Sequence, residues 1–486
     1  MELVLLFQPF LLVFTIFLSL CFLFYVLRTK PTSQKLQLPP GGSGWPFIGE
    51  TLEFLSLAKK NCIEKFISDR QNKYSSYNLF KTSYIGENFV FLCSTEANKF
   101  FFSNDTKLFK TWFPKNFDKI FLHIHKLDVT NEIAKIRKQT STLFGQHDAL
   151  QNNVTYIDAV AKEHLKVHWN REEVKVHPLA KKFTLAISLR SILNIQDSET
   201  VKELENLFNC LMTGMFSLPI NIPGTKFNRA VKASREIRKK FEGIIRQRKI
   251  EVSEKSEKSF DSSKDLLSML LMDGDKNEEG AVESDVASNL CGYIVAAYDN
   301  TSTAIVTIVK YLAELPEVYE QVYQEQIVIA NSKGPGELLN LEDINKMKYS
   351  WNVASEVLRL QPPFSGLFRE VLTDFNYDGF LIPKGWKVHL TVHATHKSSK
   401  YFQDPEKFDP SRFQENKLVP FSYIPFGRGP HMCPGKEHAK LQILVLMHNL
   451  VKTFRWEKLI PDEPLIRDPI LAPAKGLPVR LYRHKP

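Results

Sequence analysis

The sequence predicts a mainly α-helical protein with a small β portion, preceded by one transmembrane helix. The middle of the chain, from about Leu143 to Leu315, repeats apolar residues at helical spacing and carries few signals of strands. Short β-type segments occur at Asn88–Leu92 and around Thr373–Val392, where Gly379 and Pro383 mark turns. The amino terminus is a long uncharged apolar stretch.

Composition narrows the class of protein. The 486 residues are 43% hydrophobic and 24% charged, as in an average globular protein, which excludes disorder and collagen-like repeats. The net charge of +10 is modest, and no basic stripe with interleaved aromatic residues occurs, so we expect no nucleic-acid partner. The six cysteines include no Cys-x-x-Cys pair, which argues against a disulfide framework and a Cys-rich zinc site.

The first 28 residues are expected to be a membrane anchor. Leu3 to Leu27 is an uncharged stretch of 25 residues. As a helix it would be about 37 Å long, enough to cross a bilayer core of about 30 Å. The alternative is a cleaved secretory signal, but Glu2 stands where positive charge is expected and no small-x-small cleavage site follows.

A basic, Pro-rich segment follows the anchor. Its Lys and Arg residues favour a cytosolic location for the rest of the chain. The run Leu38-Pro39-Pro40-Gly41-Gly42 predicts a stiff hinge. The alternative is a flexible linker, but Trp45 and Phe47 suggest that the hinge packs against the body. The predicted division is therefore residues 1–28 for the anchor, 29–50 for the hinge and 51–486 for the cytosolic domain.

Two long helices are predicted in the second half of the chain. The apolar-periodic run from Val282 to Leu315 ends before Pro316 and predicts one long, largely buried helix. A second helical run, Glu437 to Val451, follows a tight loop rich in proline and glycine.

That loop reads Pro425-Phe426-Gly427-Arg428-Gly429-Pro430-His431-Met432-Cys433-Pro434-Gly435. A thiolate at Cys433 would meet the free amides and partial positive charge of the following helix amino terminus, which suits it to binding a metal. A chain of this composition would contain the spacing Phe-x-x-Gly-x-x-x-Cys-x-Gly by chance about once in a thousand times. The alternative is an ordinary buried cysteine.

A second motif pairs a carboxylate with a guanidinium. Glu356 and Arg359 lie on a short helix that Pro362 ends, and their i, i+3 spacing places them on one face. Alone this is a weak signal, because a surface pair has the same spacing. Downstream, Arg412 in the run Phe408-Asp409-Pro410-Ser411-Arg412-Phe413 offers a second guanidinium for a three-residue charge network.

The cysteine loop, Glu-x-x-Arg and Pro-x-Arg-Phe, in this order behind an anchor and a Pro-rich hinge, resemble a eukaryotic microsomal cytochrome P-450 over the whole chain. The resemblance implies the P-450 fold and haem b (iron protoporphyrin IX), with Cys433 as the metal ligand and proximal thiolate and Phe426 in the same haem-binding loop. It also implies that Glu356, Arg359 and Arg412 form a structural network before that loop.

The resemblance further implies partners for the haem propionates. Arg369, just past Pro362-Pro363, and Arg137 match the family's cationic positions, although either could be a solvated surface charge. The family usually has Arg two residues before the cysteine, whereas this chain has His431. A neutral imidazole can still form a hydrogen bond with a propionate, but its charge varies near pH 7.

The long helix carries the expected catalytic residues and a second departure from the family. The family pattern is Ala/Gly-Gly-x-Asp/Glu-Thr-Thr/Ser, and this chain reads Ala296-Ala297-Tyr298-Asp299-Asn300-Thr301. Asp299 is expected to relay protons. Asn300 replaces the alcohol that orders water, and its amide both donates and accepts. Thr301 could substitute, but it lies about 100° further round the helix.

Closer similarity is to plant triterpenoid oxidases, which oxidise β-amyrin, lupeol or related skeletons, often at the C-28 methyl. It rests on Lys310-Tyr311-Leu312-Ala313-Glu314-Leu315-Pro316, Met347-Lys348-Tyr349-Ser350-Trp351-Asn352-Val353-Ala354, Pro405–Phe413 and Gly429–Glu437. The segments expected to contact substrate are Trp112–Asp128, Leu211–Pro223, Ile294–Ala297, Phe364–Leu367 and Leu471–Leu477. Leu211–Pro223 is apolar enough to enter a bilayer, or else it is ordinary helix core.

The resemblance implies a monooxygenase in the endoplasmic reticulum membrane, single-pass, with its catalytic domain in the cytosol. It would use O₂ and electrons from NADPH through NADPH-cytochrome P-450 reductase to oxidise a lipophilic terpenoid. The alternatives are a taxane-like diterpenoid or sterol hydroxylase, and a haem-thiolate isomerase or dehydratase that never activates O₂. Ala297 and Asn300 are the residues that favour the last of these.

Overall fold

The computed structural model describes residues 14–16, 19, 20, 23, 37–46, 48–74, 78–84, 86–121, 138–140, 142–144, 147–254, 265–272, 283–415, 417–467 and 470–484. Most of the predicted anchor, Phe47 and Arg137 lie outside these residues. Among the residues described, no helix combines the length and the apolar character needed to cross a membrane. None of the five cysteines described forms a disulfide bond.

The fold is mainly helical with small sheets, as the sequence predicts. The helices are α2 Thr51–Lys59, α3 Ile63–Lys73, α4 Thr95–Asn104, η1 Lys115–Lys119, α6 His147–His168, α7 Val176–Leu193, α8 Ser198–Met215, α9 Lys226–Glu254, α10 Leu266–Met272, α11 Glu283–Glu314, α12 Pro316–Asn331, α13 Leu341–Lys346, α14 Lys348–Leu360, α15 His393–His396, η3 Pro410–Phe413, η4 Gly429–His431 and α16 Lys436–Thr453. The strands are β1 Leu79–Tyr84, β2 Glu87–Leu92, β3 Phe109–Thr111, β4 Glu173–Lys175, β5 Gly366–Val371, β6 Phe375–Tyr377, β7 Phe380–Ile382, β8 Lys387–Thr391, β9 Phe454–Lys458, β10 Leu465–Arg467, β11 Leu471–Pro473 and β12 Pro478–Arg483.

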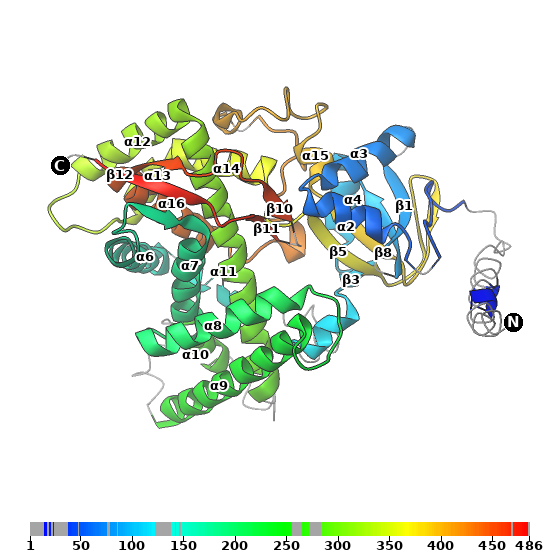
Figure 1. The fold of residues 1–486 in the computed structure, drawn as a ribbon, viewed down its shortest axis with the longest axis horizontal. Helices are drawn as coiled ribbons and strands as arrows, with labels where there is room; N and C mark the ends of the chain where they lie inside the picture. The colour runs from blue at the N-terminus through cyan, green and yellow to red at the C-terminus, as the bar shows by residue number, and fades with distance from the viewer. Residues whose placement is uncertain are drawn as a thin grey trace, which may run out of the picture.

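Helix α11 runs through the middle of the molecule and is the long buried helix that the sequence predicts (Figure 1). It packs against α7, α9, α14 and α16. Its amino-terminal half contributes to an apolar core with α8, α9 and α10, and its carboxy-terminal half to a second core with α6, α7, α12, α14 and α16. The hydroxyl of Thr184 on α7 donates to the Tyr298 carbonyl (2.9 Å), which fixes α11 to α7 at the level of the predicted catalytic residues.

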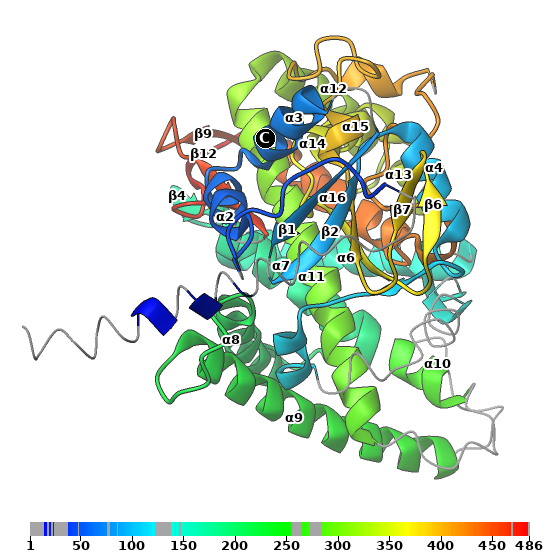
Figure 2. The same cartoon turned by 90° about the vertical axis from the view of Figure 1, so that its right-hand side faces the viewer.

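The larger sheet lies on the other side of α11 from α6, α7, α12 and α16, with α2, α3, α4 and α15 beside it (Figures 1 and 2). Its strand order is β1-β2-β8-β5-β3, and β2 pairs with β8 in parallel although almost 300 residues separate them. The sequence prediction of β structure around β2 and β6 to β8 is confirmed. It did not include β5, the strand that carries Arg369.

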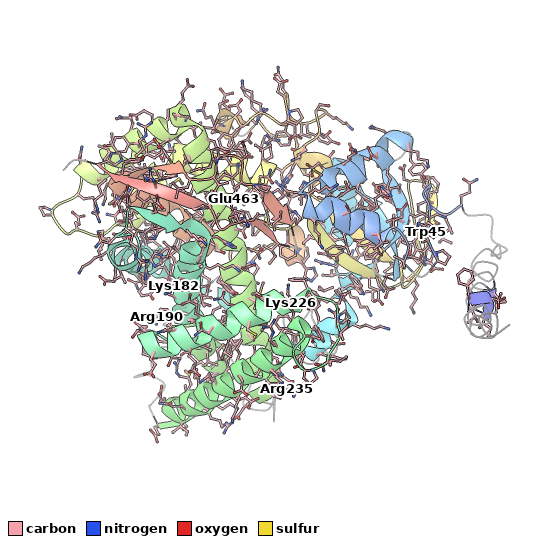
Figure 3. All side chains as sticks on the ribbon, in the orientation of Figure 1. Trp45, Lys182, Arg190, Lys226, Arg235 and Glu463 are labelled. Atoms are coloured by element: carbon pink, nitrogen blue, oxygen red, sulfur yellow. The ribbon has the colours of Figure 1, made fainter. Side chains whose placement is uncertain are left out.

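The hinge docks on this sheet through its backbone. Lys81 N–H donates to the Pro40 carbonyl (2.7 Å), and Trp45 and Gly49 exchange two backbone hydrogen bonds in a tight turn. A Cβ on Gly49 would lie 1.9 Å from the Ser83 carbonyl oxygen, so only glycine permits this approach. The hinge thus packs against the body as expected, but not through Trp45, because the turn directs that side chain outward and leaves it 76% exposed (Figure 3).

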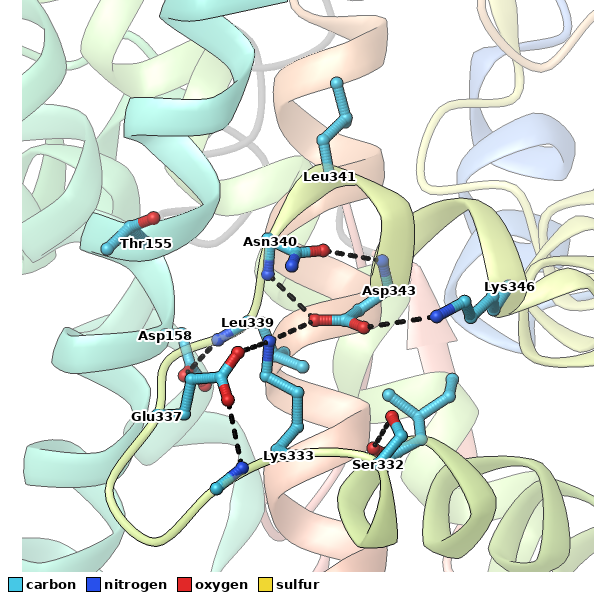
Figure 4. Close-up of polar contacts among 12 residues, drawn as sticks. Thr155, Asp158, Ser332, Lys333, Glu337, Leu339, Asn340, Leu341, Asp343 and Lys346 are labelled. Carbon is cyan, nitrogen blue, oxygen red and sulfur yellow. Dashed lines mark hydrogen bonds and ion pairs between the residues drawn. The ribbon is translucent and has the colours of Figure 1, made fainter.

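Polar contacts fix the connection between α12 and α13 (Figure 4). Asn340 and Asp343 form a capping box at the start of α13. Lys333 bridges Asp343 (2.9 Å) and Glu337 (2.6 Å), and buried Asp158 on α6 accepts from the Leu339 amide (3.0 Å). These contacts hold the start of the short segment that leads into α14.

Helix α14 carries a fully buried ion pair. Arg359 donates through Nε (2.7 Å) and Nη2 (2.8 Å) to the two carboxylate oxygens of Glu356, and both side chains are 0% exposed. Arg412 of η3 approaches the same carboxylate to 3.4 Å, and the Asp409 amide donates to it (2.9 Å). The structure thus brings together the three residues of the expected network, Glu356, Arg359 and Arg412.

We predict that Glu356→Gln destabilises the fold by about 3–5 kcal/mol, because the Arg359 charge would remain buried without a counter-charge. Urea unfolding and the yield of folded, haem-containing protein measure the effect. The control is Glu203→Gln, which removes the carboxylate from the exposed pair with Lys240 (2.8 Å) and should cost about 0–1 kcal/mol. Equal losses in the two variants would contradict a special role for the buried pair.

Candidate active site

The cysteine loop closes on its own backbone just before α16. The Cys433 amide donates to the Phe426 carbonyl (2.8 Å). Gly427 and Gly429 both have φ near +69°, a left-handed conformation that favours glycine. A Cβ on Gly429 would lie 3.0 Å from the Phe102 carbonyl oxygen, so this glycine lets the loop lie directly on the end of α4. The partly buried Cys433 therefore has a fixed position three residues before Lys436, where α16 begins.

The segment before this loop is fixed to α14 and to the buried ion pair. Ile424 N–H donates to His396 Nε2 (2.9 Å), and the His396 carbonyl accepts from Arg359 Nη1 (2.7 Å). The Tyr423 hydroxyl donates to the Ser355 carbonyl (3.0 Å). Burial, together with the nearby Arg359 charge, lowers the pKa of His396 to about 3, so the ring is neutral and can accept the Ile424 bond.

The middle of α11 has an incompletely buried stripe of small and polar residues. Ala296 is exposed and Ala297 is partly buried, whereas the adjacent Tyr298 and Asp299 are buried. Asn300 donates through Nδ2 to the Ala296 carbonyl (3.0 Å), while its buried Oδ1 accepts no hydrogen bond from the residues described. This leaves an acceptor on α11 that a water molecule could use.

The acid and the second hydroxyl of this stretch have other partners. The Asp299 carboxylate lies 2.7 Å from Lys181 Nζ on α7 and forms an ion pair with it. Asp299 is 4% exposed and Lys181 23% exposed at the side chain, so the lysine connects the buried acid to the surface. Thr301 donates to the Ala297 carbonyl (2.8 Å), which turns its hydroxyl back onto its own helix.

Arg369 and His431, the two described residues expected near the haem propionates, meet at a third residue. Asp105, at the end of α4, accepts from Arg369 Nε (2.7 Å) and Nη2 (3.2 Å). His431 Nδ1 lies 2.7 Å from the same carboxylate. Burial alone would raise the pKa of Asp105, but the bonds from His431 and Arg369 outweigh burial and hold that pKa below its usual range.

The segment Leu211–Pro223, expected to contact either substrate or membrane, divides into two parts. Leu211 and Met215 are buried in the core between α8 and α9. Leu218, Ile220 and Ile222, in the connection to α9, are 76%, 48% and 61% exposed. The segment is therefore helix core in its first half and an exposed apolar surface in its second.

Two residues of this site carry no recognisable signal in the sequence. Asp105 lies 264 positions before Arg369 and 326 before His431, and Lys181 lies more than 100 positions before Asp299. Asp105 follows α4 and Lys181 lies on α7, and only the tertiary fold places each of them against its partner. The structure brings Asp105 to Arg369 and His431, and brings Lys181 to Asp299.

These residues fit the haem that the sequence resemblance implies. The loop offers a soft thiol ligand, Arg369 and His431 offer nitrogen donors suited to carboxylates, and the accessible alanines offer an apolar wall. The stripe on α11 is the observation that tests the fit. Ala296 is exposed although its helix runs through the centre of the molecule, so small side chains leave room beside α11.

Comparisons with known proteins agree with this arrangement. The family model described as cytochrome P450 matches residues 39–479. A luvungin A synthase of Citrus sinensis is 54% identical over 467 residues, covering 96% of this chain and 97% of that protein. A beta-amyrin 28-monooxygenase of Kalopanax septemlobus is 48% identical over 479 residues, covering 98% of each chain.

A solved structure also matches. The retinoic acid-bound cyanobacterial CYP120A1 has a TM-score of 0.78 and 28% sequence identity, covering 93% of this chain and 100% of that one. The resemblance to a triterpenoid oxidase-like P-450 is thereby confirmed. The chain belongs to the cytochrome P450 family and is a haem-dependent monooxygenase of that family.

Proposed function

We propose that the enzyme oxidises a plant triterpene of the β-amyrin or lupeol type. The observation that carries the proposal is sequence identity over nearly the whole chain, 48% with a beta-amyrin 28-monooxygenase and 54% with a luvungin A synthase. The chemistry is insertion of one oxygen atom from O₂ into an unactivated C–H bond, while two electrons and two protons reduce the other oxygen atom to water. The electrons come from NADPH, and we propose NADPH-cytochrome P-450 reductase as the redox partner.

In this proposal the cofactor is haem b, with Cys433 as its thiolate ligand. Arg369 and His431 would hold the propionates, with Arg137 as a further candidate, and Phe426 lies in the same loop. When bound, the haem supplies oxygen activation, which the electron-donating thiolate favours. The protein's contribution is to place the thiol, to deliver protons and to hold an apolar substrate.

Asp299 and Asn300 are the proposed proton-delivery residues, and Thr301 is the third candidate. The ion pair with Lys181 (2.7 Å) holds the Asp299 carboxylate against α7 and connects it to a lysine that is partly exposed. Asn300 presents a buried Oδ1 with no hydrogen bond from the described residues, which would hold one water beside α11. Thr301 already donates to a backbone carbonyl and is the weaker candidate.

We further propose a single-pass anchor at residues 1–28 in the endoplasmic reticulum membrane, with the catalytic domain in the cytosol. Exposed Leu218, Ile220 and Ile222 suit contact with lipid, because large apolar side chains at a surface mark an interaction site. A lipophilic substrate would then enter from the bilayer. The hinge of residues 29–50 would connect the anchor to the catalytic domain of residues 51–486.

Turnover by microsomes of yeast that co-express the chain and a plant reductase tests the substrate proposal. We expect β-amyrin or lupeol to gain oxygen, detected by mass spectrometry, with matched consumption of O₂ and NADPH. Matched controls omit the reductase. If the enzyme oxidises a taxane diterpene or a sterol but neither triterpene, the triterpene proposal is wrong and the substrate belongs to that other class. Conversion of a bound triterpene without O₂ or NADPH would favour an isomerase or dehydratase.

Cys433→Ser should abolish the red-shifted Soret band of the reduced carbonyl complex, because that band requires a thiolate ligand. Difference spectra of purified protein measure it. Cys210→Ser is the matched control, since Cys210 is a partly buried free cysteine on α8, and it should keep the band. Persistence of the band in Cys433→Ser would contradict the assignment of the ligand.

Asn300→Ala should raise the yield of hydrogen peroxide per NADPH, because it removes the proposed water-holding acceptor while keeping α11 helical. Asn300→Thr should keep coupling close to that of the unaltered enzyme. Thr307→Ala, which removes another side-chain bond to an i−4 carbonyl of α11 (2.8 Å), should leave the peroxide yield unchanged. An unchanged peroxide yield in Asn300→Ala would remove Asn300 from the proton path.

A further inference from the structure

The end of α4 lies directly against the cysteine loop. Asp105 is the residue that follows α4, and it is 1% exposed. The 3-10 helix η4 packs on α4, and the close approach of Gly429 to the Phe102 carbonyl keeps the two backbones in contact. Strand β3, which begins at Phe109, follows α4 almost at once and pairs with β5. The chain around Asp105 therefore joins the strand that carries Arg369 to the loop that carries Cys433.

The Asp105 carboxylate binds one side chain from each of these two elements. Arg369 Nε and Nη2 donate to it from β5 (2.7 and 3.2 Å), and His431 Nδ1 lies 2.7 Å away on η4. At the side chain, Asp105 is 0%, Arg369 7% and His431 8% exposed. A carboxylate that only balanced the arginine would need no contact with η4.

This arrangement leaves donors of both side chains available for another anion. A guanidinium has five N–H donors. Arg369 uses Nε and one donor of Nη2 for Asp105, and Nη1 donates to the Phe368 carbonyl (3.0 Å). Three contacts thus fix the guanidinium plane, while two N–H groups have no hydrogen-bond acceptor among the residues described. The bond at His431 Nδ1 likewise fixes the imidazole ring and turns Nε2 away from Asp105.

We propose that Asp105 is a positioning residue that holds Arg369 and His431 in the orientation in which they bind the carboxylate groups of the haem. This inference rests on the haem site of the proposed function. Side chains held in place by a second set of hydrogen bonds lose less conformational freedom when a ligand binds, so a fixed pair retains its ligand longer. Asp105 itself would not touch the haem.

Haem transfer to excess apomyoglobin from the full-length holoenzyme tests the proposal. Asp105→Asn keeps the size of the side chain and removes its charge, and it should speed transfer by about tenfold or more and shift the reduction potential. His431→Gln should also speed transfer. The double variant should lose haem more slowly than the product of the two single effects predicts, because both changes act on one hydrogen-bonded pair.

Glu370→Gln is the matched control. Glu370 is the neighbour of Arg369 on β5 and pairs with Lys387 (3.0 Å) and Lys110 (2.9 Å), so its loss removes a carboxylate from the same strand. Its haem transfer and potential should equal those of the unaltered enzyme. If Asp105→Asn lowers thermal stability but leaves haem transfer within twofold of the control, Asp105 is a structural partner only and the proposal is overturned.

Two further outcomes separate the possible failures. If Asp105→Asn does not fold, Asp105→Glu keeps the charge and moves the carboxylate by one methylene. Faster haem transfer in that variant would support the proposal, and unchanged transfer would overturn it. If the unaltered chain acquires no haem at all, the proposed haem site fails, and this is visible in the absorption spectrum before any variant is compared.

Discussion

The buried pair of Glu356 and Arg359 is the interaction on which the position of the cysteine loop depends. It is local in sequence, but its outer contacts reach the carbonyls of His396 and Lys407 and the amide of Asp409. These contacts lie on the long irregular path between β8 and the cysteine loop. From His396 a further bond runs to Ile424, the residue directly before that loop. A chain of hydrogen bonds therefore links one turn of α14 to the backbone that presents Cys433.

Such a pair is stable only when its remaining polar groups are satisfied, since removing two charges from water costs more than their attraction returns. The Glu356 carboxylate receives two bonds from Arg359 and one from the Asp409 amide, with Arg412 nearby at 3.4 Å. Arg359 in turn donates to two backbone carbonyls. The network orders a stretch of chain that has little regular secondary structure of its own, because each bond to the ion pair fixes one point of that stretch.

The sequence correctly predicted those structural features that depend on residues close together in the chain. Pro316 ends α11 and Pro362 follows α14, as predicted, and the glycine-rich loop precedes α16. The geometry of Glu356 and Arg359 follows from helical spacing alone. Local signals failed for Trp45, because apolar character does not say which side of a backbone turn meets the sheet.

Features that depend on distant pairing could not be predicted in this way. The parallel pairing of β2 with β8 joins segments almost 300 residues apart, and periodicity within either segment says nothing about the other. The same holds for Asp105 and Lys181, whose partners lie on elements that only the completed fold brings near. Arg369 and His431 were recognisable from the family pattern, but the acid that joins them was not. The cysteine loop and the long helix of the candidate site could therefore be predicted from the sequence, whereas the residues that orient the other side chains could not.

The neutral His396 ring makes the link between α14 and the cysteine loop sensitive to acid. Its pKa in the fold is about 3, because burial and the Arg359 charge disfavour the protonated ring, whereas an unfolded chain takes up this proton near pH 6.5. Below about pH 6.5 the unfolded chain binds this proton and the folded chain does not. The stability that the neutral His396 ring contributes is therefore complete above that pH and declines as the pH falls toward 3. Proton uptake at one histidine would thus favour release of the loop that carries the thiol, and acidification would couple loss of the fold to loss of the cofactor.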